Sequence, residues 1–164
     1  MNGEYTGLAI RIRGNLTELE RVAQRASYMH QKAVTTSEGG FWDAVALNLH
    51  AFYAGVEQSL EDIARTLDGS IPQGPYWHQE LLLQMSGAAA NLRPAVITRN
   101  TRICLDEYRE FRHVVRNIYP FNLRPARLQE LMNDLRPCLE AVARELEEFA
   151  VFLEQIARQD EDQS

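Results

Sequence analysis

The helical pattern that decides the fold is clearest in Tyr108-Arg109-Glu110-Phe111-Arg112-His113-Val114-Val115-Arg116-Asn117-Ile118-Tyr119. At about 100° per residue, its apolar and polar side chains fall on opposite sides of a helix. The apolar side contains Phe111, Val114, Val115 and Ile118. The polar side gathers three guanidiniums, an imidazole, an amide and a phenol, from Arg109, Arg112, His113, Arg116, Asn117 and Tyr119. This helix is expected to end just after Tyr119, because Pro120 disfavours helical geometry in the residue before it.

The polar side of this helix has two interpretations. It can be the solvated basic face of an ordinary amphipathic helix, since charged faces are common. It can also be a phosphate site, because the chain has a formal net charge of -6 and yet no acidic residue lies between Phe111 and Tyr119. Arginine suits bidentate phosphate binding better than lysine does. However, Lys32 is the only lysine in the chain, so the choice of arginine is not special to this helix.

The rest of the chain also shows helical periodicity and no convincing alternation of period two. The helix of the opening stretch is expected to begin near Pro94, which suits a first turn. Further helices are expected over Tyr5–Val34, Phe41–Leu67, Trp77–Met85 and Ala126–Arg158, the last with a kink or break at Pro137. The polar residues 159–164 are expected to be a disordered tail. The prediction is an all-α, single-domain bundle over residues 1–164, with four long helices and one short helix.

Composition sets the class of protein. A chain of 164 residues with 45% hydrophobic and 24% charged residues is ordinary for one globular domain. Cys104 and Cys138 have no paired spacing, so free thiols in a reducing cytosol are expected. Arg11 and Arg13 interrupt the apolar residues near the N-terminus, and no stretch is long enough to span a membrane. A cytoplasmic protein is therefore expected.

Several familiar sites are absent from the sequence. It has no Gly-rich phosphate loop, no His-Glu-x-x-His motif and no Gly-x-Ser-x-Gly elbow. The four histidines, His30, His50, His78 and His113, lie in different elements, so neither a metal nor another cofactor is expected. His50 adjoins an apolar stripe and is interpreted as a core or interface histidine. For His78, the favoured interpretation is a solvated side chain beside an anchoring Trp77.

Three blocks of sequence carry a resemblance to a known family. Between residues 41 and 131 the chain is similar to the HepT-like family of the HEPN superfamily, helical-bundle proteins of bacterial toxin–antitoxin pairs. The order and spacing of the blocks make the resemblance fairly specific. The blocks are Leu49-His50-x-Phe52-Tyr53-x-Gly55-x-Glu57, Pro72-x-Gly74-x-x-Trp77-His78-x-x-Leu81-Leu82 and Phe111-Arg112-His113-Val114-Val115-Arg116-Asn117-x-Tyr119.

The resemblance implies a metal-independent ribonuclease site, usually completed across a homodimer. The family signature is an Arg, four to six residues, a His, and a Tyr two positions on. Arg112 matches the Arg and Tyr119 the Tyr, but Asn117 stands at the His position. The nearest imidazole is that of His113. The implied partner is a small nucleotidyltransferase antitoxin that adds AMP to the motif tyrosine, here Tyr119.

The departure at Asn117 leaves the function open. An imidazole transfers protons near neutral pH and a guanidinium stabilises phosphorane charge, whereas an amide can only orient a group. The first reading is a ribonuclease toxin that uses Arg112 and His113, with Arg109, Arg112 and Arg116 holding RNA. The second is a non-catalytic module that binds a nucleotidyltransferase or RNA. The third is an unrelated helical scaffold.

Overall fold

Five α-helices account for most of the residues that the computed structural model describes, which are 2–117 and 123–164. Within these ranges, the side chains of Asn2, Arg116 and Asn117 are not described. The helices are α1 (Asn2–Thr35), α2 (Gly40–Ile63), α3 (Trp77–Met85), α4 (Arg99–Asn117) and α5 (Pro125–Asp162), with a π-helical turn, η1 (Ala64–Asp68), after α2. No strand occurs in the described ranges, which confirms the all-α fold class.

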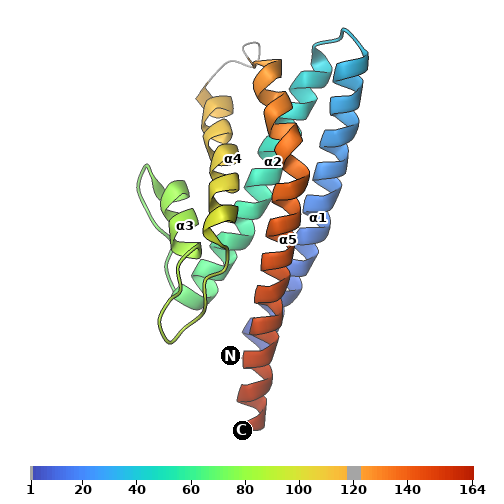
Figure 1. Ribbon diagram of the computed structural model, residues 1–164. Coiled ribbons are helices and arrows are strands. Elements are labelled where there is room, and N and C mark those ends of the chain that lie inside the picture. Colours follow the sequence, from blue (N-terminus) through green and yellow to red (C-terminus); the bar gives the residue numbers. More distant parts are fainter. Residues whose placement is uncertain (1, 118–122) are drawn as a thin grey trace.

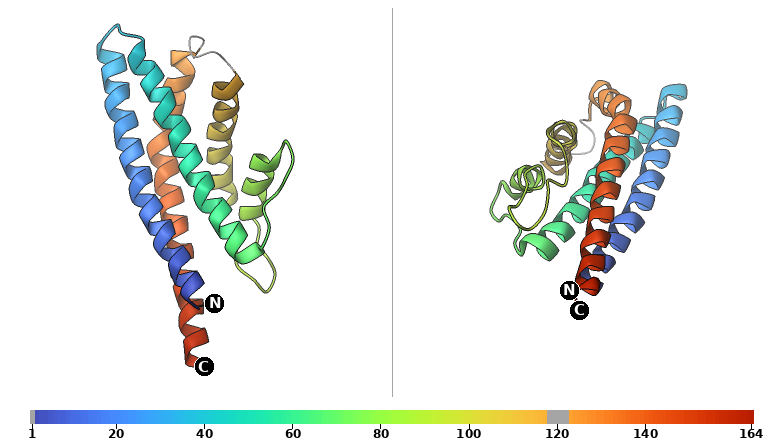
Figure 2. Two further views of the ribbon diagram at one scale, coloured as in Figure 1. Left: turned by 180° about the vertical axis from the view of Figure 1, so that it is seen from behind. Right: turned by 60° about the horizontal axis from the view of Figure 1, so that its bottom comes forward.

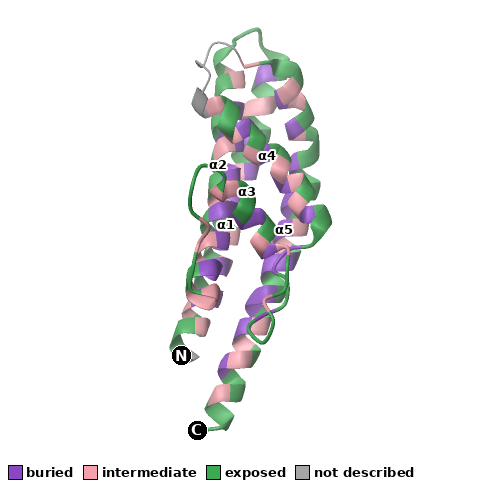
Figure 3. Ribbon diagram, turned by 90° about the vertical axis from the view of Figure 1, so that its left-hand side faces the viewer, coloured by how far each residue is buried: buried purple, intermediate pink, exposed green. Residues whose placement is uncertain are grey.

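The helices α1, α2 and α5 run side by side along the length of the molecule, and α4 packs against α2 and α5 (Figures 1 and 2). The short helix α3 lies on the outer side, against α2 and α4. Viewed from this side, α3 and the loops that flank it carry mostly exposed and half-buried residues (Figure 3). The arrangement therefore places residues of α3 beside the polar side of α4.

A glycine allows α1 and α2 to approach closely. A Cβ atom at Gly55 would lie 2.7 Å from Cδ2 of the buried Leu19. At the same crossing, the Asn15 side chain donates hydrogen bonds to the Gly55 carbonyl (2.7 Å) and to Oγ of Ser59 (2.5 Å). Gly55 thus fixes the spacing between the two helices, and α2 carries part of the site described below.

The predicted boundary of α4 is wrong at its start. The helix begins at Arg99 rather than near Pro94. Thr98 is the N-cap, because its Oγ accepts a hydrogen bond from the Thr101 N–H (3.2 Å). The buried Glu145 of α5 reinforces this cap by accepting from the Thr98 N–H and from Oγ of Thr101, each at 2.5 Å. A carboxylate at this point satisfies donors that the first turn of a helix leaves without partners. The predicted short helix, Trp77–Met85, is confirmed at both ends.

The helix α5 is longer and more continuous than predicted. It continues through Pro137 without a break and extends to Asp162, so residues 159–162 are helical rather than a disordered tail. Proline removes a hydrogen bond to the residue four positions earlier. Here both Pro137 and Asn133 are exposed, so the carbonyl that loses its partner lies on the solvent face, where water can hydrogen-bond to it.

The prediction of free thiols is wrong. Cys104 of α4 and Cys138 of α5 form a disulfide with their Cα atoms 6.1 Å apart, within the usual range. The two residues are 34 positions apart in sequence, and only the packing of α4 on α5 brings them together. The argument for a reducing cytosol that rested on these cysteines therefore no longer holds. Among the described helices, none combines the length and apolarity needed to cross a membrane.

Candidate functional site

The helix α3 brings an imidazole to the polar side of α4. His78, the second residue of α3, lies between Glu57 of α2 and Arg112 of α4. Its Nδ1 is 2.6 Å from Oε2 of Glu57, and its Nε2 is 3.2 Å from Nη1 of Arg112. We call this arrangement the Glu57–His78–Arg112 row. Three elements far apart in sequence thus contribute one residue each.

The two hydrogen bonds of His78 are compatible with one neutral tautomer. A guanidinium has donors and no acceptor, so Nε2 of His78 must accept from Arg112. The proton of a neutral imidazole then lies on Nδ1, which donates to the carboxylate of Glu57. The Glu57 side chain is 7% exposed and that of His78 is 18% exposed. The carboxylate therefore fixes both the ring orientation and the tautomer, as carboxylates do for many functional histidines.

The inner end of the row is buried and polar. Burial, followed by the neighbouring carboxylate of Glu57, raises the pKa of Tyr53 well above its usual value. Two atoms here, the hydroxyl of Tyr53 and Nε of Arg112, are buried without a hydrogen-bond partner among the described residues. Such atoms are rare in native structures and often mark a functional site.

The outer end of the row opens into a cavity of about 230 Å³. This is nearly eight times the roughly 30 Å³ that a water molecule occupies in the liquid, and so suits one phosphodiester with part of its sugar. Two guanidiniums and two imidazoles line it. The lining residues are Pro75, Tyr76, His78, Gln79, Arg109, Arg112 and His113. We call this the Arg112 pocket.

The structure brings together some of the predicted site residues. Arg112 and the exposed His113 both line the Arg112 pocket. Arg109 also lines it, but its Nε donates to Asp106 at 2.6 Å, which raises the pKa of Arg109 and offsets part of its charge. Arg116 and Asn117 belong to α4, but their side chains lie outside the described part of the structure. Tyr119 lies outside the described residues altogether.

Two residues of the site were missed by sequence reasoning. The prediction that His78 is solvated is wrong, and His113 is not the only imidazole near Arg112. Glu57 was not predicted at all. A signal for it existed, because Glu57 is a charged residue within the apolar stripe of α2, next to the buried Val56. Such a carboxylate needs a partner.

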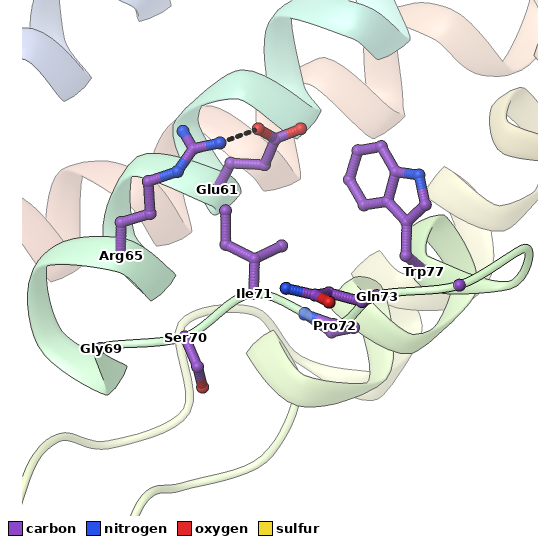
Figure 4. A pocket seen from close by; sticks show the side chains of 9 residues that line it. Glu61, Arg65, Gly69, Ser70, Ile71, Pro72, Gln73 and Trp77 are labelled. Carbon is purple, nitrogen blue, oxygen red and sulfur yellow. Dashed lines mark hydrogen bonds and ion pairs between the residues drawn. The ribbon is translucent and has the colours of Figure 1, made fainter.

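A larger cavity, about 720 Å³, has Trp77 in its lining (Figure 4). It is formed by the end of α2, η1 and the loop before α3, and its charged residues, Glu61 and Arg65, pair with each other at 3.2 Å. The indole of Trp77 separates it from His78, with ring centroids 3.6 Å apart. This cavity offers no unpaired cation to a phosphate among its lining residues, so the smaller Arg112 pocket is the better candidate for chemistry.

Metal ligands are not gathered in the described part of the chain, where no group of three or more His, Cys, Asp or Glu could hold a metal ion.

Comparison with known proteins identifies one family. Residues 44–153 match the family model described as HepT-like protein. Neither a curated protein nor a solved structure gives a significant match to the chain.

Proposed function

Because the chain belongs to the HepT-like family, we propose that it is the toxin of a toxin–antitoxin pair and cleaves RNA without a metal. The observation that carries the proposal is the Arg112 pocket, where guanidiniums and imidazoles from α3 and α4 face one cavity. Guanidiniums stabilise developing phosphorane charge, and imidazoles move protons at neutral pH. Membership of the family also removes the reading of an unrelated helical scaffold.

The proposal assigns roles to residues of α4. Arg112 holds the scissile phosphate, with Arg109 and Arg116 contacting flanking phosphates. His113 transfers a proton, and Asn117 orients the sugar or phosphate by hydrogen bonding. The acidic chain argues against broad affinity for nucleic acid and permits one local basic patch. We further propose that residues 1–164 form a single HepT-like domain that acts in the cytoplasm, where its RNA substrate is found.

We propose a homodimer in which two copies of the polar side of α4 face one cleft. Exposed apolar residues beside the Arg112 pocket support this assembly. A groove between α3 and α4 shares Gln79 with the pocket and contains Leu83 and Ile103, which are 59% and 51% exposed. Exposed apolar residues of this size, grouped together, are typical of an interface.

The proposed partner is a small nucleotidyltransferase that neutralises the toxin by adding AMP to Tyr119. The modified protein would carry a bulky anion on Tyr119, two positions after Asn117 in the sequence. The added charge would compete with RNA for the arginines of α4. A gene for a small nucleotidyltransferase next to the gene for this chain would support the proposal.

A cleavage assay with purified protein tests the ribonuclease proposal. Arg112→Ala should abolish cleavage, because removal of a charge-stabilising group costs several kcal/mol in comparable sites. His113→Ala should reduce the rate by about 10²- to 10⁴-fold. Asn117→His should preserve or raise the rate, and chelators should have no effect. Circular dichroism would check that each variant is folded. If His113→Ala cleaves as fast as wild type, then His113 is not a proton carrier.

The second candidate function is a non-catalytic module that binds a nucleotidyltransferase or RNA through the same arginines. Asn117 favours it, because an amide cannot transfer a proton where the family signature has a histidine. The same assay separates the candidates. A wild-type protein that cleaves nothing, together with an Asn117→His variant that cleaves, would identify a binding module that has lost its catalyst.

A further inference from the structure

We infer that His78 is a catalytic base that Arg112 masks. A phosphate group that draws Arg112 into the pocket frees Nε2 of His78, while Glu57 holds the imidazole ring in place. The inference deepens the proposed function and rests on it. It identifies His78, which lies outside the α4 motif, as a proton carrier. It also explains why His78 acts only when RNA is bound.

The hydrogen bonds of the Glu57–His78–Arg112 row are the evidence that Arg112 masks His78. Nε2 of His78 accepts from Nη1 of Arg112 at 3.2 Å, so the lone pair that a base needs is occupied. The opposite ring nitrogen is held by Glu57 at 2.6 Å. A ring held by a carboxylate on one nitrogen and free on the other is the arrangement of a general base, as in hydrolytic triads.

The buried Nε of Arg112 is the evidence that a phosphate could move this side chain. Its Nε has no hydrogen-bond partner among the described residues, although it is buried. A buried donor without a partner is destabilising, so the guanidinium would gain a hydrogen bond by moving toward an acceptor. A phosphate in the Arg112 pocket could accept from Nε and Nη2 together, in the bidentate geometry that arginine prefers. The same movement would uncover Nε2 of His78.

The charges around His78 favour its role as a proton acceptor. The titratable and charged groups around it are Glu57 from α2, Tyr76 from the turn before α3, and Arg109, Arg112 and His113 from α4, with Tyr53 beside Glu57. Once Arg112 is paired with a phosphate, the nearest opposing charge is the buried carboxylate of Glu57. An opposite charge at hydrogen-bond distance stabilises an imidazolium.

The proposed step is a transesterification in which atoms and charges balance. Nε2 of His78 takes the proton of the ribose 2′-hydroxyl, and the 2′-oxygen bonds to phosphorus. The bond from phosphorus to the 5′-oxygen breaks, and that oxygen takes a proton from the imidazolium of His113 on the same pocket. The products are a cyclic 2′,3′-phosphate and a 5′-hydroxyl. Glu57 touches neither substrate nor reacting atoms, so it is a positioning residue.

Variants at both residues of the Glu57–His78 pair test the inference. His78→Asn keeps a donor near Glu57 but cannot carry a proton, so it should lower cleavage by about 10²- to 10⁴-fold. It should also remove from the pH–rate profile the limb that reports an essential base. Glu57→Gln should reduce the rate and displace that limb, an effect that loss of packing alone would not produce. His30→Asn is the matched control, because His30 is half-buried and hydrogen-bonded (2.6 Å to Gln129) but lies on α1 outside the pocket.

A binding measurement separates this inference from the ribonuclease proposal. An RNA oligonucleotide with one 2′-deoxy position, which cannot be cleaved there, is titrated into ¹⁵N-histidine-labelled protein. The Nε2 resonance of His78 should shift on binding, and in Glu57→Gln the ring should populate both tautomers. Wild-type cleavage with His78→Asn equally active overturns the inference alone. Binding without cleavage overturns the ribonuclease proposal and, with it, the assignment of His78 as a catalytic base, whether or not the Nε2 resonance shifts. If that resonance does not shift, or if no oligonucleotide binds, the inference is overturned.

Discussion

Replacing Arg93 by methionine would test how the segment around α3 is held against the rest of the molecule. The Arg93 side chain is only 1% exposed, and that of its partner Asp68 is 11% exposed. Nε and Nη2 of Arg93 donate to the two oxygens of Asp68, each at 2.7 Å. Nη1 donates to the carbonyls of Gly87 (2.8 Å) and Pro94 (3.0 Å). One guanidinium therefore ties η1 to the chain that follows α3.

The expected loss of stability in Arg93→Met follows from the burial of the Arg93–Asp68 pair. Removing one partner of a buried ion pair costs about 3–5 kcal/mol, because the other charge stays buried without compensation. Arg93→Met should therefore lower the free energy of unfolding by about this amount at pH 7. Combining it with Asp68→Leu should cost less than the single change, since no buried charge remains. About 1–3 kcal/mol of the loss should persist in the double variant, from carbonyls that have lost a donor.

The pH dependence of the free energy of unfolding gives a second, independent test of the Arg93–Asp68 pair. Burial tends to raise the pKa of Asp68, but hydrogen bonds from Arg93 and Gln84 outweigh it, and the pKa lies below its usual value. A lowered pKa in the folded state stabilises the protein above the unfolded-state pKa. This contribution is lost as the pH falls through the folded-state pKa. In Arg93→Met only burial and the hydrogen bond from Gln84 still act on the pKa of Asp68. The difference in the free energy of unfolding between wild type and variant should therefore become smaller in acid.

The assay is urea unfolding followed by circular dichroism at pH 7 and at about pH 3, where an ordinary aspartate is mostly protonated. Arg127→Met is the control, because Arg127 pairs with Glu107 at the surface, with side chains 38% and 51% exposed. Exposed pairs contribute only about 0–1 kcal/mol. The reasoning is refuted if Arg93→Met costs no more than Arg127→Met at pH 7, or if its cost is the same at both pH values.

Three further predictions concern the packing, the assembly and the modification. Gly55→Val should lower the melting temperature, because its Cβ would meet Leu19 at 2.7 Å, and Gly14→Val, which meets nothing within 4 Å, is the control. Ile103→Asp should convert the proposed homodimer to a monomer in light scattering, and a wild-type monomer at micromolar concentration would refute that assembly. Co-expression with the cognate nucleotidyltransferase should add the mass of AMP to wild type and not to Tyr119→Phe. An unshifted wild-type mass, or an adduct that persists in the variant, would reject Tyr119 as the acceptor.

Helix periodicity predicted the elements well, because it depends on residues close in sequence. The limits of Trp77–Met85 were predicted at both ends, and the apolar side of α4 includes the buried Phe111. The start of α4 was predicted near Pro94, although Thr98 offers a local N-cap whose Oγ accepts from the Thr101 N–H. Local sequence could not predict the hydrogen bond from the Thr98 N–H to Glu145 of α5, which is 47 positions away. The pairing of Cys104 with Cys138 depends on the same contact between α4 and α5.

In the candidate site, too, residues on one helix were predicted, whereas residues brought together by tertiary packing were not. Arg112 and His113 were predicted from one helix, and both line the pocket. His78 and Glu57 were not, because they are 21 residues apart and meet only when α3 folds back onto α2. Each looked ordinary by itself, as a histidine after a tryptophan and an acid on a helix. Two sequence signals pointed to these residues: the charge within the apolar stripe of α2, and the presence of Glu57 and His78 in the blocks that resemble the HepT-like family.

The significance of Asn117 depends on where the chain places its other imidazoles. On a helix, positions 113 and 117 are one turn apart, about 6 Å along the axis and on nearly the same side. His113 can therefore face the same substrate as a histidine at position 117 would. His78 reaches Arg112 from α3, a direction that no residue of α4 could supply. A histidine missing from the α4 signature thus does not leave the pocket without imidazoles. Asn117 alone does not establish a binding module, because that reading also requires both remaining imidazoles to be inactive.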